Sequence, residues 1–216
     1  QKIKICGLST PESVQAALAG GASHLGFIFF EKSPRNLAPQ LAGDLITRAN
    51  ASRRAKTVAV TVDATDDTLD DIVQRMQPDM LQLHGKESVE RINDLKARHQ
   101  LPIIKALAIR EAADLEKVAT YDPVSDLLLL DAKPPAGSQL PGGNGVRFDW
   151  TVLKRLKSST PILLSGGIDI SNVGEAMDYV RDGQNSIAGL DVSSGVESSP
   201  GAKDIAKIEI FLAACQ

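Results

Sequence analysis

The sequence predicts a (β/α)8 barrel, a single compact domain in which eight parallel strands alternate with helices. Eight short runs of strand-forming residues recur along the chain, and segments with apolar residues at helical spacing lie between them. Dividing 216 residues by eight leaves 27 residues for each strand, helix and pair of loops, which suits this fold. A doubly wound open sheet uses the same alternation but rarely contains eight such even units. We therefore expect residues 1–216 to form one barrel domain.

Each expected strand is a run of apolar or β-branched residues, as in strands buried on both faces. In chain order the runs are Ile3–Cys6, His24–Phe29, Thr57–Val62, Met80–His84, Ile103–Leu107, Leu127–Asp131, Pro161–Ser165 and Ile187–Val192.

Helices are expected between these runs. Apolar residues recur at helical spacing at Leu69, Ile72, Val73 and Met76, and again at Val173, Ala176, Met177 and Val180. Thr10 followed by Pro11 is typical of a helix start, and Ser171-Asn172 precedes the later helix. The segment 132–147, after the sixth strand, is rich in glycine and proline and has no apolar period, which predicts an active-site loop.

Composition limits the function classes. The chain is 43% hydrophobic and 24% charged, and no apolar run approaches the roughly 20 residues that a membrane helix needs. With 24 basic and 27 acidic residues, the chain has no net positive charge that would attract a polyanion such as nucleic acid. The start, Gln1-Lys2-Ile3-Lys4, is already strand-like, so we expect no signal peptide and a cytoplasmic location. Either a monomer or a homodimer fits this composition.

Polar residues lie at the ends of several expected strands. Cys6 ends the first strand, Asp131 the sixth, and Asp191 lies near the end of the eighth. In the fourth strand, alternation places Gln82 and His84 on one face, where we expect both to contact a substrate. Since barrel enzymes carry their chemistry at the C-terminal ends of the strands, these side chains should converge. A cysteine in an apolar strand is by itself more often a small buried hydrophobe, but its position at the strand end favours chemistry.

Small residues after the last two strands predict a phosphate site. Ser165-Gly166-Gly167 and Ser193-Ser194-Gly195 occupy the two loops that most often hold phosphate in these barrels. Either segment alone could be an ordinary tight turn, but the occurrence of both in neighbouring loops is more specific for a phosphate site. Gly142-Gly143-Asn144-Gly145 would add N–H donors, although a glycine-rich lid explains it almost as well. The residues expected to contact phosphate are Gly143, Gly145, Gly166, Gly167, Ser193 and Ser194.

Three basic residues stand out. Arg35 follows Pro34 just after the second strand, where a rigid turn would present its guanidinium to a carboxylate, unless it is a solvated surface arginine. Lys4 and Lys105 fall inside strands, where we expect internal ion pairs, with acids such as Asp63, rather than catalysis. The two cysteines, Cys6 and Cys215, do not have the spacing of a zinc site or a redox pair.

Seven motifs in order along the chain resemble those of the phosphoribosylanthranilate isomerases, (β/α)8 barrels of tryptophan biosynthesis. We find no departure at a position on which the family's mechanism depends. The motifs are Lys4-Ile5-Cys6-Gly7, Phe29-Phe30-Glu31-Lys32-Ser33-Pro34-Arg35, Leu81-Gln82-Leu83-His84-Gly85, Leu130-Asp131-Ala132-Lys133, Gly142-Gly143-Asn144-Gly145 with Phe148-Asp149-Trp150, Leu164-Ser165-Gly166-Gly167, and Leu190-Asp191-Val192-Ser193-Ser194-Gly195-Val196-Glu197.

This resemblance implies an Amadori rearrangement of a phosphorylated aminoaldose, with no metal and no organic cofactor. It implies that Asp131 is the general acid, which protonates the ring oxygen of the sugar, and that Cys6 is the general base, which takes the proton from C2′. It further implies that Arg35 binds the anthranilate carboxylate, that Asp191 contacts the sugar or amine, and that the last two loops hold the 5′-phosphate.

Two other functions are compatible with this kind of barrel. The sister isomerase of histidine biosynthesis performs the same rearrangement on a larger substrate with two phosphates, but it uses aspartate where this chain has Cys6. A barrel that only binds a phosphorylated sugar without catalysis is the second alternative. The presence of both Cys6 and Asp131 argues against it.

Overall fold

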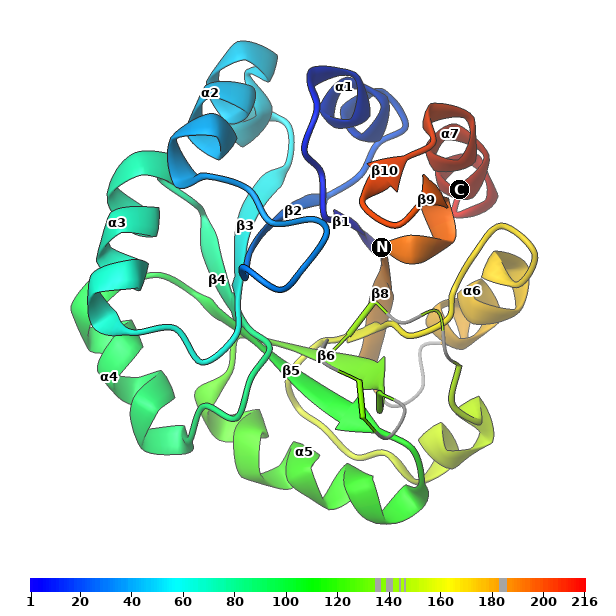
Figure 1. Cartoon of the computed structure of the whole chain (residues 1–216). Coiled ribbons are helices and arrows are strands. Elements are labelled where there is room, and N and C mark those ends of the chain that lie inside the picture. Colours follow the sequence, from blue (N-terminus) through cyan, green and yellow to red (C-terminus); the bar gives the residue numbers. More distant parts are fainter. Residues whose placement is uncertain (135–136, 139–141, 144, 146, 183–185) are drawn as a thin grey trace.

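Eight parallel strands close into a barrel in a computed structural model, which describes residues 1–216 except 135–136, 139–141, 144, 146 and 183–185 (Figure 1). Each strand is hydrogen-bonded to its neighbours in sequence, and β8 returns to β1. The predicted fold class is confirmed. The strands are β1 (Lys2–Cys6), β2 (His24–Phe29), β3 (Lys56–Thr61), β4 (Met80–Leu83), β5 (Ile103–Ile109), β6 (Leu127–Ala132), β7 (Ile162–Leu164) and β8 (Ile187–Val192).

Helices form a ring around the barrel, and α7 lies beside α1, so the ring closes where the barrel does (Figure 1). The α-helices are α1 (Pro11–Ala19), α2 (Pro39–Ala49), α3 (Asp66–Met76), α4 (Val89–His99), α5 (Glu116–Tyr121), α6 (Val173–Arg181) and α7 (Ile205–Ala214). Short 3₁₀ helices join them: η1 (Ala51–Arg53), η2 (Ala112–Leu115), η3 (Asp122–Val124), η4 (Trp150–Arg155) and η6 (Ser194–Val196).

One of the two expected helix caps forms as the sequence predicts. Thr10 is the N-cap of α1, and its hydroxyl accepts a hydrogen bond from the Ser13 amide at 3.2 Å. Asn172 does precede α6, but its side chain does not cap that helix. It accepts from the Asp169 amide and donates to the Gly167 carbonyl, at 2.9 and 2.8 Å. Asn172 therefore stabilises the turn after β7 instead.

Across the part of the chain that the structure describes, the regular alternation of strand and helix is interrupted at two places. Among the described residues between β6 and β7, the 3₁₀ helix η4 stands where an α-helix is expected. After β8, η6 and a small antiparallel hairpin of β9 (Glu197–Ser199) and β10 (Ala202–Lys203) come before α7. Strands of three and two residues are too short to show an apolar alternation, so the sequence does not reveal this hairpin.

Apolar side chains fill two layers, which follow from the alternation of side chains along each strand. Leu127 and Leu129 of β6 point into the barrel, whereas Leu128 and Leu130 pack against the helices. The barrel interior is filled by Cys6, Val58, Val60, Met80, Ile104, Ala106, Leu127, Leu129 and Leu163.

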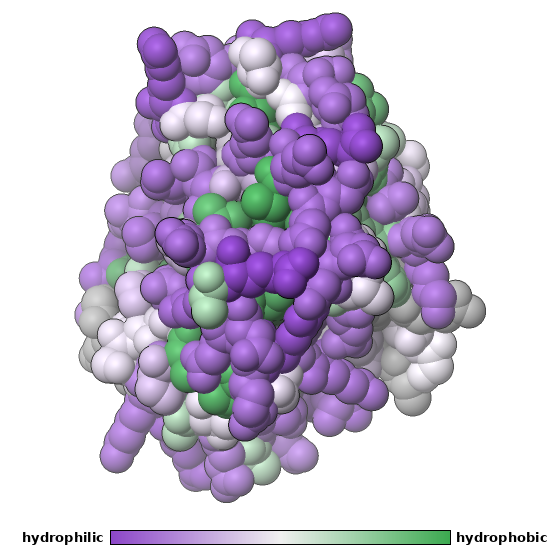
Figure 2. Space-filling model, turned by 90° about the vertical axis from the view of Figure 1, so that its left-hand side faces the viewer, coloured by the Kyte–Doolittle hydropathy of each residue, from purple (hydrophilic) through white to green (hydrophobic). Residues whose placement is uncertain are grey.

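Hydrophilic residues cover most of the side of the molecule that Figure 2 shows, with apolar residues visible only in small groups between them. The exposed large hydrophobic side chains of the described residues are Leu41, Ile170 and Ile210, which belong to three different segments. In the described part of the chain, none of the helices combines the length and the apolar character needed to span a bilayer.

Candidate active site

All twelve residues that the sequence predicts for the site line one cleft at the C-terminal ends of the strands. The cleft measures about 780 Å³ with its open mouth included. One wall of the cleft is apolar, a feature that the sequence pattern does not predict. It is formed at the ends of β2 and β3 by Ile28, Phe30, Val60 and Val62. Among the described residues, no group of three or more His, Cys, Asp or Glu side chains is arranged to hold a metal ion.

Cys6 ends β1 and is buried at the bottom of this cleft. Gly26 on the adjacent strand makes room for it, because a Cβ atom at Gly26 would lie 2.9 Å from the Cys6 sulfur and 3.1 Å from Lys4 Nζ. Burial raises the pKa of Cys6 above its ordinary value. The positive charges of Lys4 and Lys203 oppose this shift, whereas the Asp191 carboxylate adds to it.

Lys4 is fully buried inside the barrel and pairs with Asp191. Its ammonium donates to Asp191 Oδ1 at 2.7 Å, and the Ser165 hydroxyl donates to Oδ2 at 2.9 Å. Burial alone would lower the pKa of Lys4, but the nearby Asp191 carboxylate and the Cys6 side chain raise it above its ordinary value. The prediction of an internal ion pair is confirmed, although Asp63 is the wrong partner. Lys105 also forms a buried pair, with Glu87 at 2.6 Å.

Asp131, His84 and Gln82 form a chain of polar contacts across the cleft. His84 Nε2 lies 3.3 Å from Asp131 Oδ2, and Gln82 Nε2 lies 3.1 Å from His84 Nδ1. With the Gln82 amide nitrogen placed here, Nδ1 is the acceptor of this contact, and Nε2 is the ring nitrogen that faces Asp131. Asp131 Oδ1 accepts from the Ala132 amide at 2.9 Å. The predicted shared face of Gln82 and His84 is therefore confirmed, and it brings them to Asp131.

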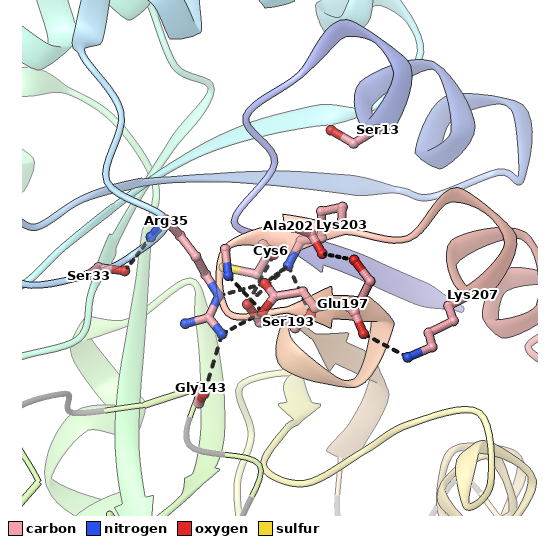
Figure 3. Close-up of polar contacts among 12 residues, drawn as sticks. Cys6, Ser13, Ser33, Arg35, Gly143, Ser193, Glu197, Ala202, Lys203 and Lys207 are labelled. Carbon is pink, nitrogen blue, oxygen red and sulfur yellow. Dashed lines mark hydrogen bonds and ion pairs between the residues drawn. The ribbon is translucent and has the colours of Figure 1, made fainter.

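Arg35 is a buried residue rather than a solvated one. Its side chain is 5% exposed, and it donates from Nε and Nη2 to the two oxygens of Glu197 at 2.7 and 2.9 Å (Figure 3). Gly7, in a left-handed conformation with φ of 77°, leaves room for the arginine, since a Cβ atom there would lie 2.7 Å from Arg35 Cδ. The sequence analysis assigned no role to Glu197.

The turn after β7 contains two consecutive glycines with positive φ. Gly166 and Gly167 have φ of 86° and 64°, which favours glycine at both positions. A Cβ atom at Gly166 would also lie 2.4 Å from the Ala132 nitrogen. Such a turn leaves its N–H groups accessible to an anion.

Ser193 and the glycines of the segment 142–145 complete this side of the cleft. Ser193 donates from its hydroxyl to the Cys6 carbonyl at 3.1 Å. Gly145 lies near Ser194, since a Cβ atom there would be 3.9 Å from the Ser194 hydroxyl oxygen. Gly143 lies beside Arg35 instead, and its carbonyl accepts from Nη2 at 3.5 Å. Asn144, in the same motif, is outside the described residues.

The family model described as N-(5'phosphoribosyl)anthranilate (PRA) isomerase matches residues 3–214 of the chain. A curated relative from Agrobacterium fabrum, named N-(5'-phosphoribosyl)anthranilate isomerase, is 56% identical over 209 residues, which cover 97% of this chain and 92% of the relative. A relative of the same name from Brucella canis is 55% identical over 212 residues, with 98% and 92% covered.

Solved structures agree with this match. The phosphoribosyl anthranilate isomerase of Thermotoga maritima superposes with a TM-score of 0.85 at 30% identity, over 99% of this chain and 98% of that one. A structure of the isomerase in complex with reduced 1-(o-carboxyphenylamino)-1-deoxyribulose 5-phosphate gives a TM-score of 0.80 at 29% identity, over 99% and 97% of the two chains. Together with a family match over nearly its whole length, these likenesses show that the chain belongs to the phosphoribosylanthranilate isomerase family.

Proposed function

We propose that the chain converts N-(5'-phosphoribosyl)anthranilate to 1-(2-carboxyphenylamino)-1-deoxyribulose 5-phosphate, an Amadori rearrangement of tryptophan biosynthesis. The observation that carries this proposal is that Cys6 and Asp131 line one cleft, together with a buried arginine and two glycine- and serine-rich turns. A general acid and a general base suffice for a reaction that consists of proton transfers, the opening of the sugar ring and shifts of double bonds.

In the proposed first step, Asp131 gives a proton to the ring oxygen of the sugar. The C1′–O bond breaks, its electrons stay on oxygen, and the nitrogen lone pair forms a C=N bond. In the second step, the Cys6 thiolate takes the proton from C2′, and the released electrons form the C1′=C2′ bond of an enolamine while the C=N electrons return to nitrogen. In the tautomerisation to the aminoketone, the 2′-hydroxyl gives up one proton and C1′ takes one, which returns Asp131 and Cys6 to their starting forms. Atoms and charge therefore balance without a cofactor.

The contacts described above support a role for each remaining residue. Arg35 would bind the carboxylate of the anthranilate ring, and the apolar wall at the ends of β2 and β3 would contact the ring itself. Asp191 already accepts from Lys4 and Ser165, but each carboxylate oxygen has a second lone pair for a sugar hydroxyl or the amine. Gln82 and His84 would contact the substrate beside Asp131.

The turns after β7 and β8 would hold the 5′-phosphate. The cleft lining includes Gly166, Gly167, Ser193 and Ser194, and Gly145 lies next to Ser194. Gly143 lies beside Arg35 instead, so it would contact the phosphate only if the phosphate group extended toward Arg35. Backbone N–H groups and hydroxyls are the donors that phosphate oxygens accept from in such turns.

We further propose that the enzyme works in the cytoplasm as a monomer or a homodimer on this small phosphorylated substrate, without nucleic acid or membrane partners. One solved structure, described as that of monomers generated from the dimeric isomerase of Thermotoga maritima, has 29% identity to this chain and a TM-score of 0.78. Light scattering over a range of protein concentrations would distinguish the two assembly states.

The experiment that tests the proposed function is isomerisation by the purified protein. Phosphoribosylanthranilate, generated in situ, is followed by the loss of its fluorescence, and the product is identified by mass spectrometry and NMR as the aminoketone. We expect turnover in the wild type and in Cys215→Ser, a matched thiol control at the end of α7. A folded wild-type protein without turnover would contradict the proposal.

A further inference from the structure

The Glu197 carboxylate occupies one edge of the Arg35 guanidinium and leaves another edge free. Nε and Nη2 donate to Glu197, and Nη2 reaches the Gly143 carbonyl only at 3.5 Å. Within the described ranges, Nη1 has no hydrogen-bond acceptor. Arg35 lines the cleft, and Gly143 lies beside the edge formed by Nη1 and Nη2, where a Cβ atom would be 2.9 Å from Nη1. Because Gly143 has no side chain, it leaves this edge accessible to a ligand. A planar guanidinium held along one edge can bind a second carboxylate only from the other edge.

Glu197 is itself fixed by two further donors from the hairpin. The Gly201 amide donates to Oε2 at 3.2 Å. Lys203 Nζ donates to Oε1 at 2.6 Å (Figure 3). Lys203 also reaches the carbonyl and hydroxyl oxygens of Ser193, at 2.9 and 3.4 Å. Three acceptors match the three N–H groups of an ammonium, so these contacts fit the charged form of Lys203. The Glu197 carboxylate is therefore held in one orientation.

The hairpin also packs against the turn that precedes Arg35. Gly201 lies between β9 and β10 with φ of 86°, and a Cβ atom there would lie 2.5 Å from the Pro34 carbonyl oxygen. A side chain at Gly201 would push the hairpin and this turn apart. The fold thus brings Glu197 to Arg35 through both a backbone contact and a double hydrogen bond.

Among the described residues, this cluster contains one more cation than anion. Arg35 and Lys203 are two cations, and Glu197 is the one anion between them, with the three side chains 5%, 2% and 4% exposed. Burial alone would raise the pKa of Glu197, but Arg35 and Lys203 lower it below its ordinary value, so it is ionised. Burial lowers the pKa of Lys203, and the Glu197 carboxylate opposes that shift. An excess buried cation is costly unless an anion pairs with it.

We propose that Glu197, held by Lys203, is a positioning residue for substrate specificity, which orients Arg35 so that its free edge binds a carboxylate ortho to the amine of the substrate. This inference rests on the proposed function. On this view, the contact between β9 and the β2–α2 loop determines which aromatic amine the enzyme accepts in its substrate. Because Glu197 holds one edge of the Arg35 guanidinium, the other edge has a fixed position relative to Cys6 and Asp131. A substrate carboxylate can therefore bind Arg35 in only one position.

Binding of two stable ligands tests the inference without requiring turnover. One is reduced 1-(o-carboxyphenylamino)-1-deoxyribulose 5-phosphate, and the other is the same molecule without the ring carboxylate. By calorimetry, we expect the wild type to prefer the carboxylated ligand. In Glu197→Gln, an amide NH2 group replaces one of the two oxygens that accept from Arg35. The affinity for the carboxylated ligand should then fall roughly ten- to a hundredfold, which corresponds to the loss of one charged hydrogen bond. Affinity for the uncarboxylated ligand should change less than about threefold.

Two further variants keep the test decisive. Glu197→Asp retains the charge but shortens the side chain, so it should show a smaller loss, again only for the carboxylated ligand. Arg35→Met should lose the preference, and the double variant Arg35→Met with Glu197→Gln should bind no more weakly than Arg35→Met alone. Glu209→Gln, an exposed change on α7, is the matched control and should bind both ligands like the wild type.

Equal losses for both ligands in Glu197→Gln and Glu197→Asp would overturn the inference, because they would show a general structural role. Additive losses in the double variant would also overturn it. A wild type that isomerises phosphoribosylanthranilate yet binds both ligands equally would refute the inference and leave the proposed function intact. A wild type that prefers the carboxylated ligand but does not isomerise the substrate would refute the function alone.

Discussion

The ammonium of Lys4 lies 2.7 Å from the Asp191 carboxylate, and both side chains lie inside the barrel beside the Cys6 thiol. The two residues are register partners on β1 and β8, the pair of strands that closes the barrel. A buried cation next to the thiol favours its thiolate form, which a general base requires. The Asp191 carboxylate balances the charge of the Lys4 ammonium, which would otherwise be costly to bury in the apolar interior.

Replacing Lys4 should therefore make Cys6 less reactive at a given pH. The Lys4 charge and hydrogen bond lower the pKa of Cys6, while burial and Asp191 raise it. In Lys4→Met with Asp191→Asn, which avoids an unpaired buried charge, the pH midpoint of Cys6 alkylation by iodoacetamide should move upward. Mass spectrometry of the Cys6 peptide measures the rate, with the Cys215 peptide as an internal comparison. An unchanged midpoint would show that Lys4 favours the thiolate no more than Asp191 disfavours it.

Breaking the Lys105–Glu87 pair should destabilise the fold. The two side chains are 2% and 4% exposed, and Glu87 also accepts hydrogen bonds from the Asp63 and Gly85 amides. Lys105→Met leaves a buried carboxylate without its cation, which should cost about 3–5 kcal/mol in unfolding free energy. Lys105→Met with Glu87→Gln should recover part of that loss. Urea unfolding measures both, and equal stability of Lys105→Met and the wild type would contradict this.

His24 should make stability depend on pH. Burial, aided by the charge of Lys4, lowers the pKa of His24 to about 4, below its ordinary value of 6.5. Between these values the unfolded chain binds a proton that the folded chain does not, so stability falls as pH falls from 6.5 to 4. The loss from this group is about 3 kcal/mol. In His24→Gln the unfolding free energy should fall less over that range, and parallel curves would contradict the prediction.

Gly142 should be needed to keep Asp131 accessible. A Cβ atom at Gly142 would lie 2.3 Å from Asp131 Oδ2 and 2.8 Å from His84 Nε2. Gly142→Ala should therefore displace these groups and reduce kcat about tenfold or more, because small misplacements of catalytic groups are costly. Gly174→Ala on α6 is the control, since nothing lies within 4 Å of its added Cβ. If both variants retained full kcat, the contact at Gly142 would be unimportant for turnover.

The sequence predicted the barrel and its cleft because both depend on local patterns. Eight apolar runs mark the strands, and alternation along β4 places Gln82 and His84 together on one face. Contacts between distant segments were harder to predict. Lys4 and Asp191 are 187 positions apart and meet only when the barrel closes. Glu197 and Lys203 lie on strands of only three and two residues. In so short a segment, the sequence does not distinguish charged residues that form a buried pair from those of an exposed turn.

The most direct test of the central claim is the turnover of phosphoribosylanthranilate by Cys6→Ser and Asp131→Asn beside the wild type. We predict that each variant keeps its fold and its affinity for the reduced product analogue while kcat falls about 100- to 10,000-fold, as expected for the loss of a general base or acid. If either variant turned over substrate at the wild-type rate, that residue would not be the proton carrier.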